Sequence, residues 1–144
     1  MKAIRKVLVL AVLSALVLSS CGKYEDGPAI SLLPKTMRLQ KQWQMEKLYI
    51  DGTEQTLNDV QKDSYFELES GGGYKYTTVT GSVSAVTSEG TWELTNSKET
   101  LVITTTFGGL NINTEHTILR LTSKELWVEK TVNNAVYEEH YKVR

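Results

Sequence analysis

The chain has two histidines, His116 and His140, and each stands beside carboxylates that would suit acid–base chemistry or metal binding. Glu115 precedes the first histidine, and Glu138 and Glu139 precede the second. Neighbouring residues on a β-strand point to opposite faces, so Glu115 and His116 do not form a ready-made dyad in a strand. We therefore expect two solvated histidines on strand surfaces, and neither a catalytic pair nor a metal site.

Other motifs that carry chemistry are missing from the sequence. The glycine run at 71–73 lacks the Gly-Lys-Ser/Thr ending of a phosphate-binding loop, so it is interpreted as a turn between strands. No serine lies in a Gly-x-Ser-x-Gly nucleophile elbow, and Asp51, Asp59 and Asp63 lack the spacing of a calcium-binding loop. We predict no enzymatic activity and no cofactor.

The first 20 residues have the pattern of a secretory signal peptide. Three basic residues precede an apolar run over residues 7–18, which Ser14 alone interrupts. A basic start followed by a short apolar run is typical of such a leader, and this run is too short for a comfortable membrane-spanning helix. We expect residues 1–20 to be cleaved from the mature protein.

The leader ends in Leu18-Ser19-Ser20-Cys21, which resembles the lipobox of bacterial lipoproteins. In that class of protein the cysteine thiol is lipid-modified, the leader is cut just before it, and the new amine is usually acylated, typically with palmitate. Two or three acyl chains make a durable membrane anchor, whereas one holds only weakly. The resemblance implies that Cys21 attaches lipid. As the only cysteine, it also excludes an intrachain disulfide.

The residues after the cysteine bear on location. Gly22 stands where an aspartate would resemble an inner-membrane retention signal, which favours the outer membrane. Lys23-Tyr24-Glu25-Asp26 loosely resembles the export tag of surface lipoproteins in the Bacteroidota, although a tyrosine separates the lysine from the acidic residues. We expect a lipid anchor in the outer membrane, and the periplasmic and surface faces both stay open.

Length and charge limit the remaining choices. The chain has 144 residues, which suits one domain and is too short for two sizeable cores. Without the three basic residues of the leader, 13 Lys and Arg stand against 17 Asp and Glu, a net charge of about −4. Nucleic-acid binding draws its energy largely from neutralised phosphates, so a weakly acidic chain without a basic cluster is not expected to bind nucleic acid.

The rest of the chain divides into a flexible tether over residues 21–30 and one domain over residues 31–144. Ser31 would cap a short helix with Pro34 in its first turn. From residue 42 onward, short β-rich runs alternate with turn residues, and the linking stretch near Asp59 has room for one helical turn. The eight predicted strands span residues 42–50, 64–69, 74–80, 90–95, 100–107, 111–121, 125–132 and 135–143.

Apolar residues alternate along these runs as they do in a sheet with one buried face. In the last strand, for example, Tyr137, Tyr141 and Val143 share one parity. The first strand breaks its parity, which predicts a bulge near Glu46–Lys47. Eight short strands joined by hairpin-length turns predict an all-β, eight-stranded antiparallel up-and-down barrel with a short N-terminal helix. Such an interior holds packed side chains or one small ligand.

At this point the pattern resembles the lipocalins. Leu39–Met45 resembles the start of a lipocalin, in which an early tryptophan packs across the barrel base, and Glu89–Leu94 and Leu119–Leu126 are similar to lipocalin-like lipoproteins of the Bacteroidota. Lys41 departs from the pattern, since lipocalins have a glycine there. The resemblance covers roughly residues 31–144. It implies a structural contact in which Arg120 stacks on Trp43.

We expect a non-catalytic binding protein that holds a small apolar or amphipathic ligand between the barrel walls. The candidate ligand-binding residues are Trp43, Trp92, Phe107, Tyr137 and Tyr141. The alternative is a structural or interaction lipoprotein that presents its barrel surface, or a long loop over Gly81–Glu89, to a protein or glycan partner. The sequence leaves open which face carries Trp127, whose parity is opposite to that of Leu126 and Val128.

Overall fold

The computed structural model describes residues 33–144, and the predicted leader, Cys21 and the tether lie outside them. The two α-helices of the described part are α2 (Lys35–Leu39) and α3 (Asp59–Asp63), and a 3-10 turn, η1, spans Asn96–Lys98. The strands are β1 (Gln42–Ile50), β2 (Thr53–Gln55), β3 (Tyr65–Leu68), β4 (Gly73–Thr80), β5 (Val83–Thr95), β6 (Thr100–Phe107), β7 (Leu110–Leu121), β8 (Glu125–Val132) and β9 (Ala135–Val143).

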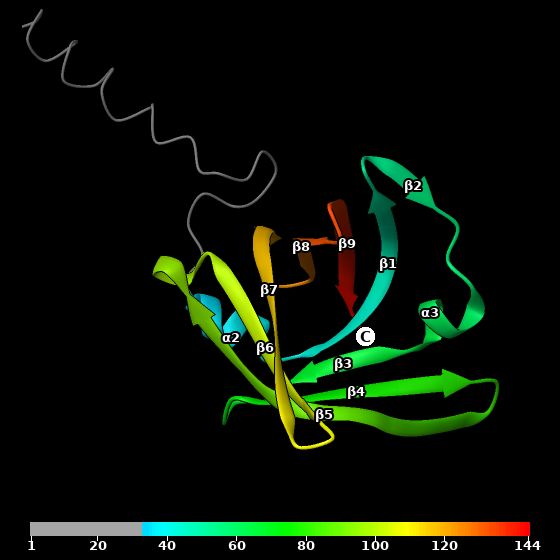
Figure 1. The fold of residues 1–144 in the computed structure, drawn as a ribbon, viewed down its shortest axis with the longest axis horizontal. Helices are drawn as coiled ribbons and strands as arrows, with labels where there is room; N and C mark the ends of the chain where they lie inside the picture. Colours follow the sequence, from blue (N-terminus) through cyan, green and yellow to red (C-terminus); the bar gives the residue numbers. More distant parts are fainter. Residues whose placement is uncertain (1–32) are drawn as a thin grey trace, which may run out of the picture. The chain divides into compact units, whose positions relative to one another are not determined.

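The strands form a closed antiparallel barrel. From β3 onward each strand pairs with the next one in the chain, β1 pairs with β3, and β1 also pairs with β9, which closes the ring (Figure 1). The short β2 forms a hairpin with the far end of β1 and lies outside the ring of eight. The predicted all-β fold, an eight-stranded up-and-down barrel with a short N-terminal helix, is confirmed.

One end of the barrel is covered by α2 and is called the closed end. The Arg38 guanidinium donates to the Leu121 carbonyl at 2.6 Å, and the Lys41 ammonium donates to the Ser123 carbonyl in the turn after β7. Leu39 and Trp43 are fully buried here, and the Trp43 indole N–H donates to the Leu39 carbonyl at 2.8 Å. The helix is therefore tied to the base of the barrel through backbone carbonyls and an apolar plug.

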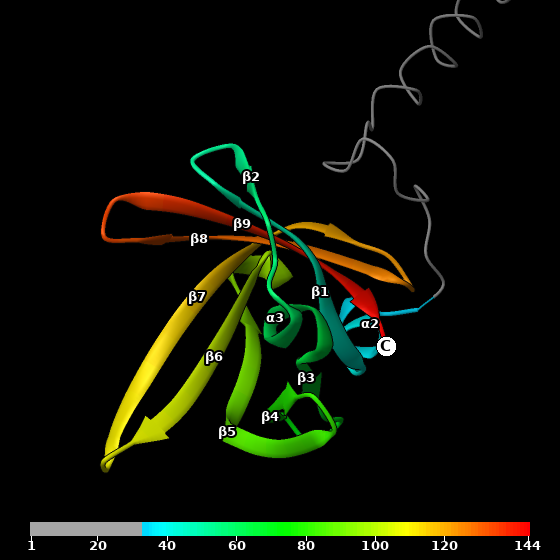
Figure 2. The ribbon, with the colours of Figure 1, turned by 90° about the vertical axis from the view of Figure 1, so that its right-hand side faces the viewer.

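The opposite, open end carries the hairpin turns after β4, β6 and β8. The β6–β7 and β8–β9 hairpins reach away from the end that carries α2 (Figure 2). Their turns use residues with positive φ: Gly108 and Gly109 in the first, Asn133 and Asn134 in the second. Glycine has no Cβ to clash there and asparagine tolerates the left-handed region, which is why both predicted turns form.

Bulges shape the barrel wall. The pairing of β1 with β9 shifts register between Met45 and Lys47, so the bulge predicted near Glu46–Lys47 is confirmed. The bulge lets Trp43 and Ile50 lie on one strand although the apolar parity changes between them. Similar shifts occur between β4 and β5 and between β7 and β8.

The prediction of a long loop at Gly81–Glu89 is wrong. Only a tight turn follows β4, and β5 begins at Val83 and pairs with β4 from there onward. The serines suggested a loop, but the β-branched Val83 and Val86 among them suit a strand, and cross-strand pairing satisfies their backbone groups. The hairpin that replaces the loop is one wall of the open end.

The predicted helical elements are present in the described part of the chain. Pro34 is the N-cap of α2, one position before the first helical turn in which it was expected, and Ser31 lies outside the described residues. The single helical turn expected near Asp59 is α3, and Asn58 and Gln61 form a reciprocal capping box at its start. This box explains why so short a helix begins where it does.

Candidate functional site

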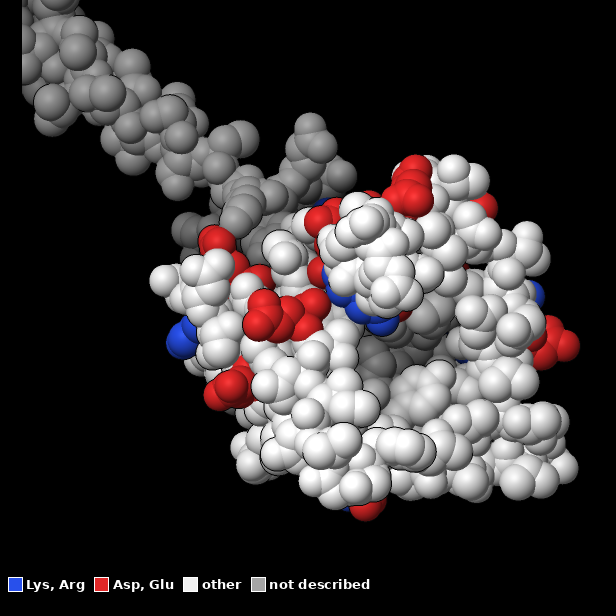
Figure 3. Space-filling model, in the orientation of Figure 1, with Lys and Arg blue, Asp and Glu red and all other residues white. Residues whose placement is uncertain are grey.

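The barrel encloses a cavity of about 300 Å³. Figure 3 shows the molecule hollowed in the middle of its view, with mostly uncharged side chains around the hollow. The walls come from every barrel strand except β5. The apolar lining residues are Met45, Phe66, Leu101, Ile103, Leu126 and Val128. The polar and aromatic lining residues are Tyr74, Tyr76, Thr105, Thr114, His116, Lys130, Glu139 and Tyr141.

An ion pair lies inside this cavity. The Lys130 ammonium is 2.8 Å from one carboxylate oxygen of Glu139, whose side chain is 8% exposed. The Tyr141 hydroxyl donates to the other carboxylate oxygen at 2.9 Å. A charge buried this deeply is stable only when it is paired and hydrogen-bonded, and Glu139 meets both conditions.

Two tyrosines of the cavity, Tyr74 and Tyr141, stay protonated. Burial, with the nearby Glu139 carboxylate and the hydrogen bond to it, raises the pKa of Tyr141 well above its ordinary value. Burial, followed by the neighbouring Tyr76 and Glu139, raises the pKa of Tyr74 to about 12. Both hydroxyls are therefore neutral hydrogen-bonding groups at physiological pH.

His116 lies in the same cavity, and the prediction that it is a solvated surface residue is wrong. It is 7% exposed, and within the described part of the chain its Nδ1 is buried without a hydrogen-bond partner. Burial, assisted by the Lys130 charge, lowers the pKa of His116, so the imidazole is neutral. The sequence-based expectation failed because Asn113, Thr114 and Glu115, which precede His116, are all polar. Their pattern does not indicate that the His116 side chain points into the barrel.

This buried histidine predicts a loss of stability in mild acid. An unfolded histidine takes up a proton near its ordinary pKa of about 6.5, whereas the pKa of folded His116 is lower. The unfolded state therefore binds more protons below about pH 6.5, and the free energy of unfolding falls by up to about 1.4 kcal/mol per pH unit until the folded pKa is reached. Urea unfolding at pH 7.5 and 5.5 should show this fall in the wild type and a smaller one in His116→Gln. Equal slopes in the two proteins would contradict it.

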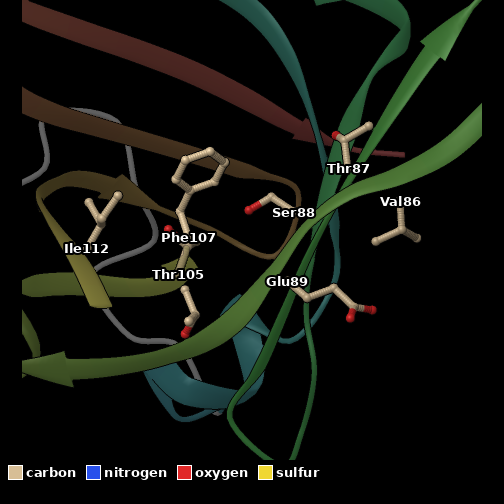
Figure 4. Close-up of a pocket in the computed structure, with 8 residues that line it drawn as sticks. Val86, Thr87, Ser88, Glu89, Thr105, Phe107 and Ile112 are labelled. Carbon is tan, nitrogen blue, oxygen red and sulfur yellow. The ribbon is translucent and has the colours of Figure 1, made fainter. Parts of the chain in front are cut away.

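A second, more open groove lies at the open end of the barrel. It has a volume of about 730 Å³ and shares Thr105 with the cavity. Figure 4 shows Phe107 and Ile112 on one side of it and the β5 segment from Val86 to Glu89 on the other. The Phe107 side chain is 79% exposed, although it has the parity of the cavity-lining Ile103 and Thr105. The β6–β7 hairpin extends beyond the opposite wall of the barrel, so its inward-facing side chains are exposed to solvent there.

The structure separates the five aromatic residues proposed for ligand binding. Tyr141 lines the cavity and Phe107 lines the outer groove. Trp43 is packed at the closed end, and Trp92 is buried with its indole N–H donating to the Glu69 carbonyl at 3.0 Å. Tyr137 is half-buried on β9 and lies outside both linings. Tyr141 is thus the predicted residue that meets the polar centre of the cavity.

The sequence analysis did not select several residues of the cavity. Lys130 and Glu139 went unselected because charged residues in an alternating pattern usually face solvent. Glu139 nevertheless has the parity of Tyr137 and Tyr141, and this parity was the signal that could have placed it inside. Tyr74 and Tyr76 share a parity in the same way.

The outer face of β7–β9 carries an aromatic stack. The Trp127 ring lies parallel to the His140 ring with centroids 4.0 Å apart, and the Arg120 guanidinium lies 4.9 Å from the Trp127 centroid. The Glu138 carboxylate lies 2.6 Å from His140 Nε2. Trp127 is therefore on the outer face, and its ring shields His140, which is 8% exposed rather than solvated as predicted.

This stack corrects the contact that the family resemblance implied for Arg120. In the described part of the chain, the Arg120 guanidinium lies over the Trp127 ring and not over the Trp43 ring. Arg120 and Trp127 are direct cross-strand partners, whereas Trp43 is enclosed at the closed end. The guanidinium also pairs with the Glu125 carboxylate at 3.0 Å, which holds it along the outer face.

Two further observations on residues 33–144 concern metal binding and membrane-spanning helices. No three His, Cys, Asp or Glu side chains among residues 33–144 lie close enough together to hold a metal ion. The helices of the same range are all too short or too polar to cross a membrane.

Comparisons with known proteins agree with the geometry. A family model described as a lipocalin-like domain matches residues 39–128. Among solved structures, insecticyanin from the tobacco hornworm Manduca sexta is similar to this chain, with a TM-score of 0.53 and 11% sequence identity. The similarity covers 85% of this chain and 68% of insecticyanin, and at this identity it concerns the fold alone. The search of curated proteins gives no match.

Proposed function

The chain belongs to the lipocalin-like domain family, and from this premise we propose that it is a non-catalytic protein that binds one small apolar or amphipathic ligand inside its barrel. The observation that carries the proposal is the cavity of about 300 Å³. Its volume lies at the lower end of the range for small-molecule sites, and its lining joins apolar walls with a few convergent polar groups. The open groove that shares Thr105 with the cavity is the entry route.

Blocking the passage between groove and cavity should abolish binding. Thr105→Trp places an indole where the two spaces meet, so we expect at least tenfold weaker binding of phenylnaphthylamine, an apolar fluorescent probe, in a fluorescence titration. Thr104→Trp is the matched control, because the neighbouring position on β6 points to the other face. Equal affinity in both variants, or no probe binding to the wild type, would argue against a ligand in the barrel.

We further propose that the barrel is anchored to the outer membrane through lipid on Cys21. The supporting observations are the basic and apolar leader and the sequence Leu18-Ser19-Ser20-Cys21. Two or more acyl chains would hold the protein durably, since each buried methylene contributes about 0.8 kcal/mol. The nine residues between Cys21 and the domain, 22–30, would reach roughly 30 Å from the bilayer.

Cys21→Ser should release the protein from the membrane. In a Gram-negative host we expect the wild type in the outer-membrane fraction and the variant in the soluble fraction after carbonate washing. Mass spectrometry of the wild type should show acyl chains on the cysteine. Retention of Cys21→Ser in the membrane would refute the anchor, and protease treatment of intact cells decides between the surface and periplasmic faces.

A further inference from the structure

We propose that the ligand of the inner cavity is an uncharged molecule with a hydroxyl head, and that this head is seated against His116 while the apolar body fills the barrel. This inference rests on the proposed function, because it specifies the chemistry of a ligand in the same cavity. It is carried by the charge balance of the lining and by one buried ring nitrogen.

The lining has no net charge to offer a charged ligand. Its two charged side chains are Lys130 and Glu139, and they pair with each other at 2.8 Å. A carboxylate ligand would compete with Glu139 for Lys130, and an ammonium ligand would compete with Lys130 for Glu139. Either ligand would lose its own hydration and leave one protein charge without a partner, which is costly in a buried site.

His116 supplies the vacant hydrogen-bonding position. Its side chain lines the cavity, and its buried Nδ1 makes no hydrogen bond of good geometry within residues 33–144, although the backbone of Leu101 and Thr114 lies close enough to the imidazole to influence its pKa. Leaving such a group unpaired is unfavourable, so a ligand that pairs with it gains affinity. A neutral imidazole has one donor and one acceptor nitrogen, and a hydroxyl can pair with either because it both donates and accepts.

The remaining walls suit an apolar body. Leu101 and Ile103 on β6 and Leu126 and Val128 on β8 line the cavity on the two sides of β7, which carries His116, and Phe66 on β3 also lines it. The passage at Thr105 leads to the outer groove, where Phe107, Ile112 and Val86 offer apolar contacts to an extended body. A hydroxyl at one end of a hydrocarbon chain suits a lining that combines polar side chains from β4, β7, β8 and β9 with apolar side chains from β1, β3, β6 and β8.

Head-group preference tests the proposal directly. Decanol, decanoate and decylammonium have the same chain and differ only in charge, so isothermal titration of the purified protein at pH 7.5 isolates the head. We expect decanol to bind at least tenfold more tightly than either ion. Stronger binding of decanoate or decylammonium, or equal binding of all three, would overturn the inference.

Two variants test the stated causes. Glu139→Gln removes the partner of Lys130, so decanoate should gain at least tenfold in affinity; Glu138→Gln, one position earlier on the outer face, is the control and should change nothing. His116→Phe should weaken decanol binding about fivefold or more, and by a larger factor than it changes the binding of phenylnaphthylamine. Circular dichroism confirms that each variant is folded, and the wild-type ranking decides the question if one of them is not.

The results also separate this inference from the proposed function. If phenylnaphthylamine and all three decyl compounds fail to bind the wild type, the ligand-binding function itself fails. If the apolar probe binds through the Thr105 passage but the decyl compounds are not ranked by charge, the function stands and the neutral hydroxyl head is wrong.

Discussion

Replacing Trp43 with alanine is expected to lower the free energy of unfolding by about 3–5 kcal/mol, the range observed when a large buried aromatic residue is truncated. The Trp43 side chain is fully buried, and its indole N–H donates to the Leu39 carbonyl. The variant loses this apolar burial and one of the two donors to the Leu39 carbonyl, which also accepts from the Lys41 backbone N–H at 2.7 Å. Because α2 covers the closed end, the variant opens the base of the barrel.

Trp127→Ala is the matched control for this experiment. Trp127 is half-buried on the outer face, where its partners are Arg120 and His140, so its removal leaves no cavity in the core. Urea unfolding followed by far-ultraviolet circular dichroism should show a midpoint shift for Trp43→Ala at least twice that for Trp127→Ala. Comparable shifts would mean that the closed end is not the centre of stability.

Gly90→Ala is expected to destabilise the barrel by about 3 kcal/mol, the upper part of the range for overpacking a core. A Cβ at Gly90 would lie 1.9 Å from the Thr104 carbonyl oxygen, a backbone atom of the neighbouring strand β6. Backbone cannot rotate away as a side chain can, so β5 and β6 would have to separate. Trp92, two residues on, would move with them.

Gly71→Ala is the control for this second substitution. A Cβ at Gly71 would meet open space, and its backbone does not need a positive φ, so we expect a change within about 0.5 kcal/mol. Thermal unfolding of both variants measures the difference. A stable Gly90→Ala protein would show that the two strands can part at this point without loss.

The barrel could be predicted from sequence because its strands obey a simple period. Alternation along β6 and β9, together with turn residues such as Asn133 and Asn134, was enough to give strand bounds close to those observed. The bulge in β1 was also predictable, because Trp43 and Leu48 are both apolar yet have opposite parity. The failure at residues 83–89 has the opposite cause: exposed Val83 and Val86 give a strand no buried face to reveal it.

The cavity was harder to predict because its chemistry depends on contacts across the barrel. Lys130 and Glu139 lie on neighbouring strands and pair across them, and although each shares the parity of apolar or aromatic neighbours, neither segment alone indicates that the two charges meet. His116 lines the same cavity from β7, the strand that pairs with β8. Parity fixes which residues share a face, but only closure of the ring decides which face is enclosed.

The closing contact between β1 and β9 has a consequence for folding. The other seven strands of the sheet lie between β1 and β9 in the chain, so one hydrogen-bonding edge of β1 stays open until residues 137–143 pair with it. Pairing across so long a stretch of chain is slow to form. Loss of β9 would leave the facing edges of β1 and β8 without a partner, so closure of the barrel depends on residues 135–143.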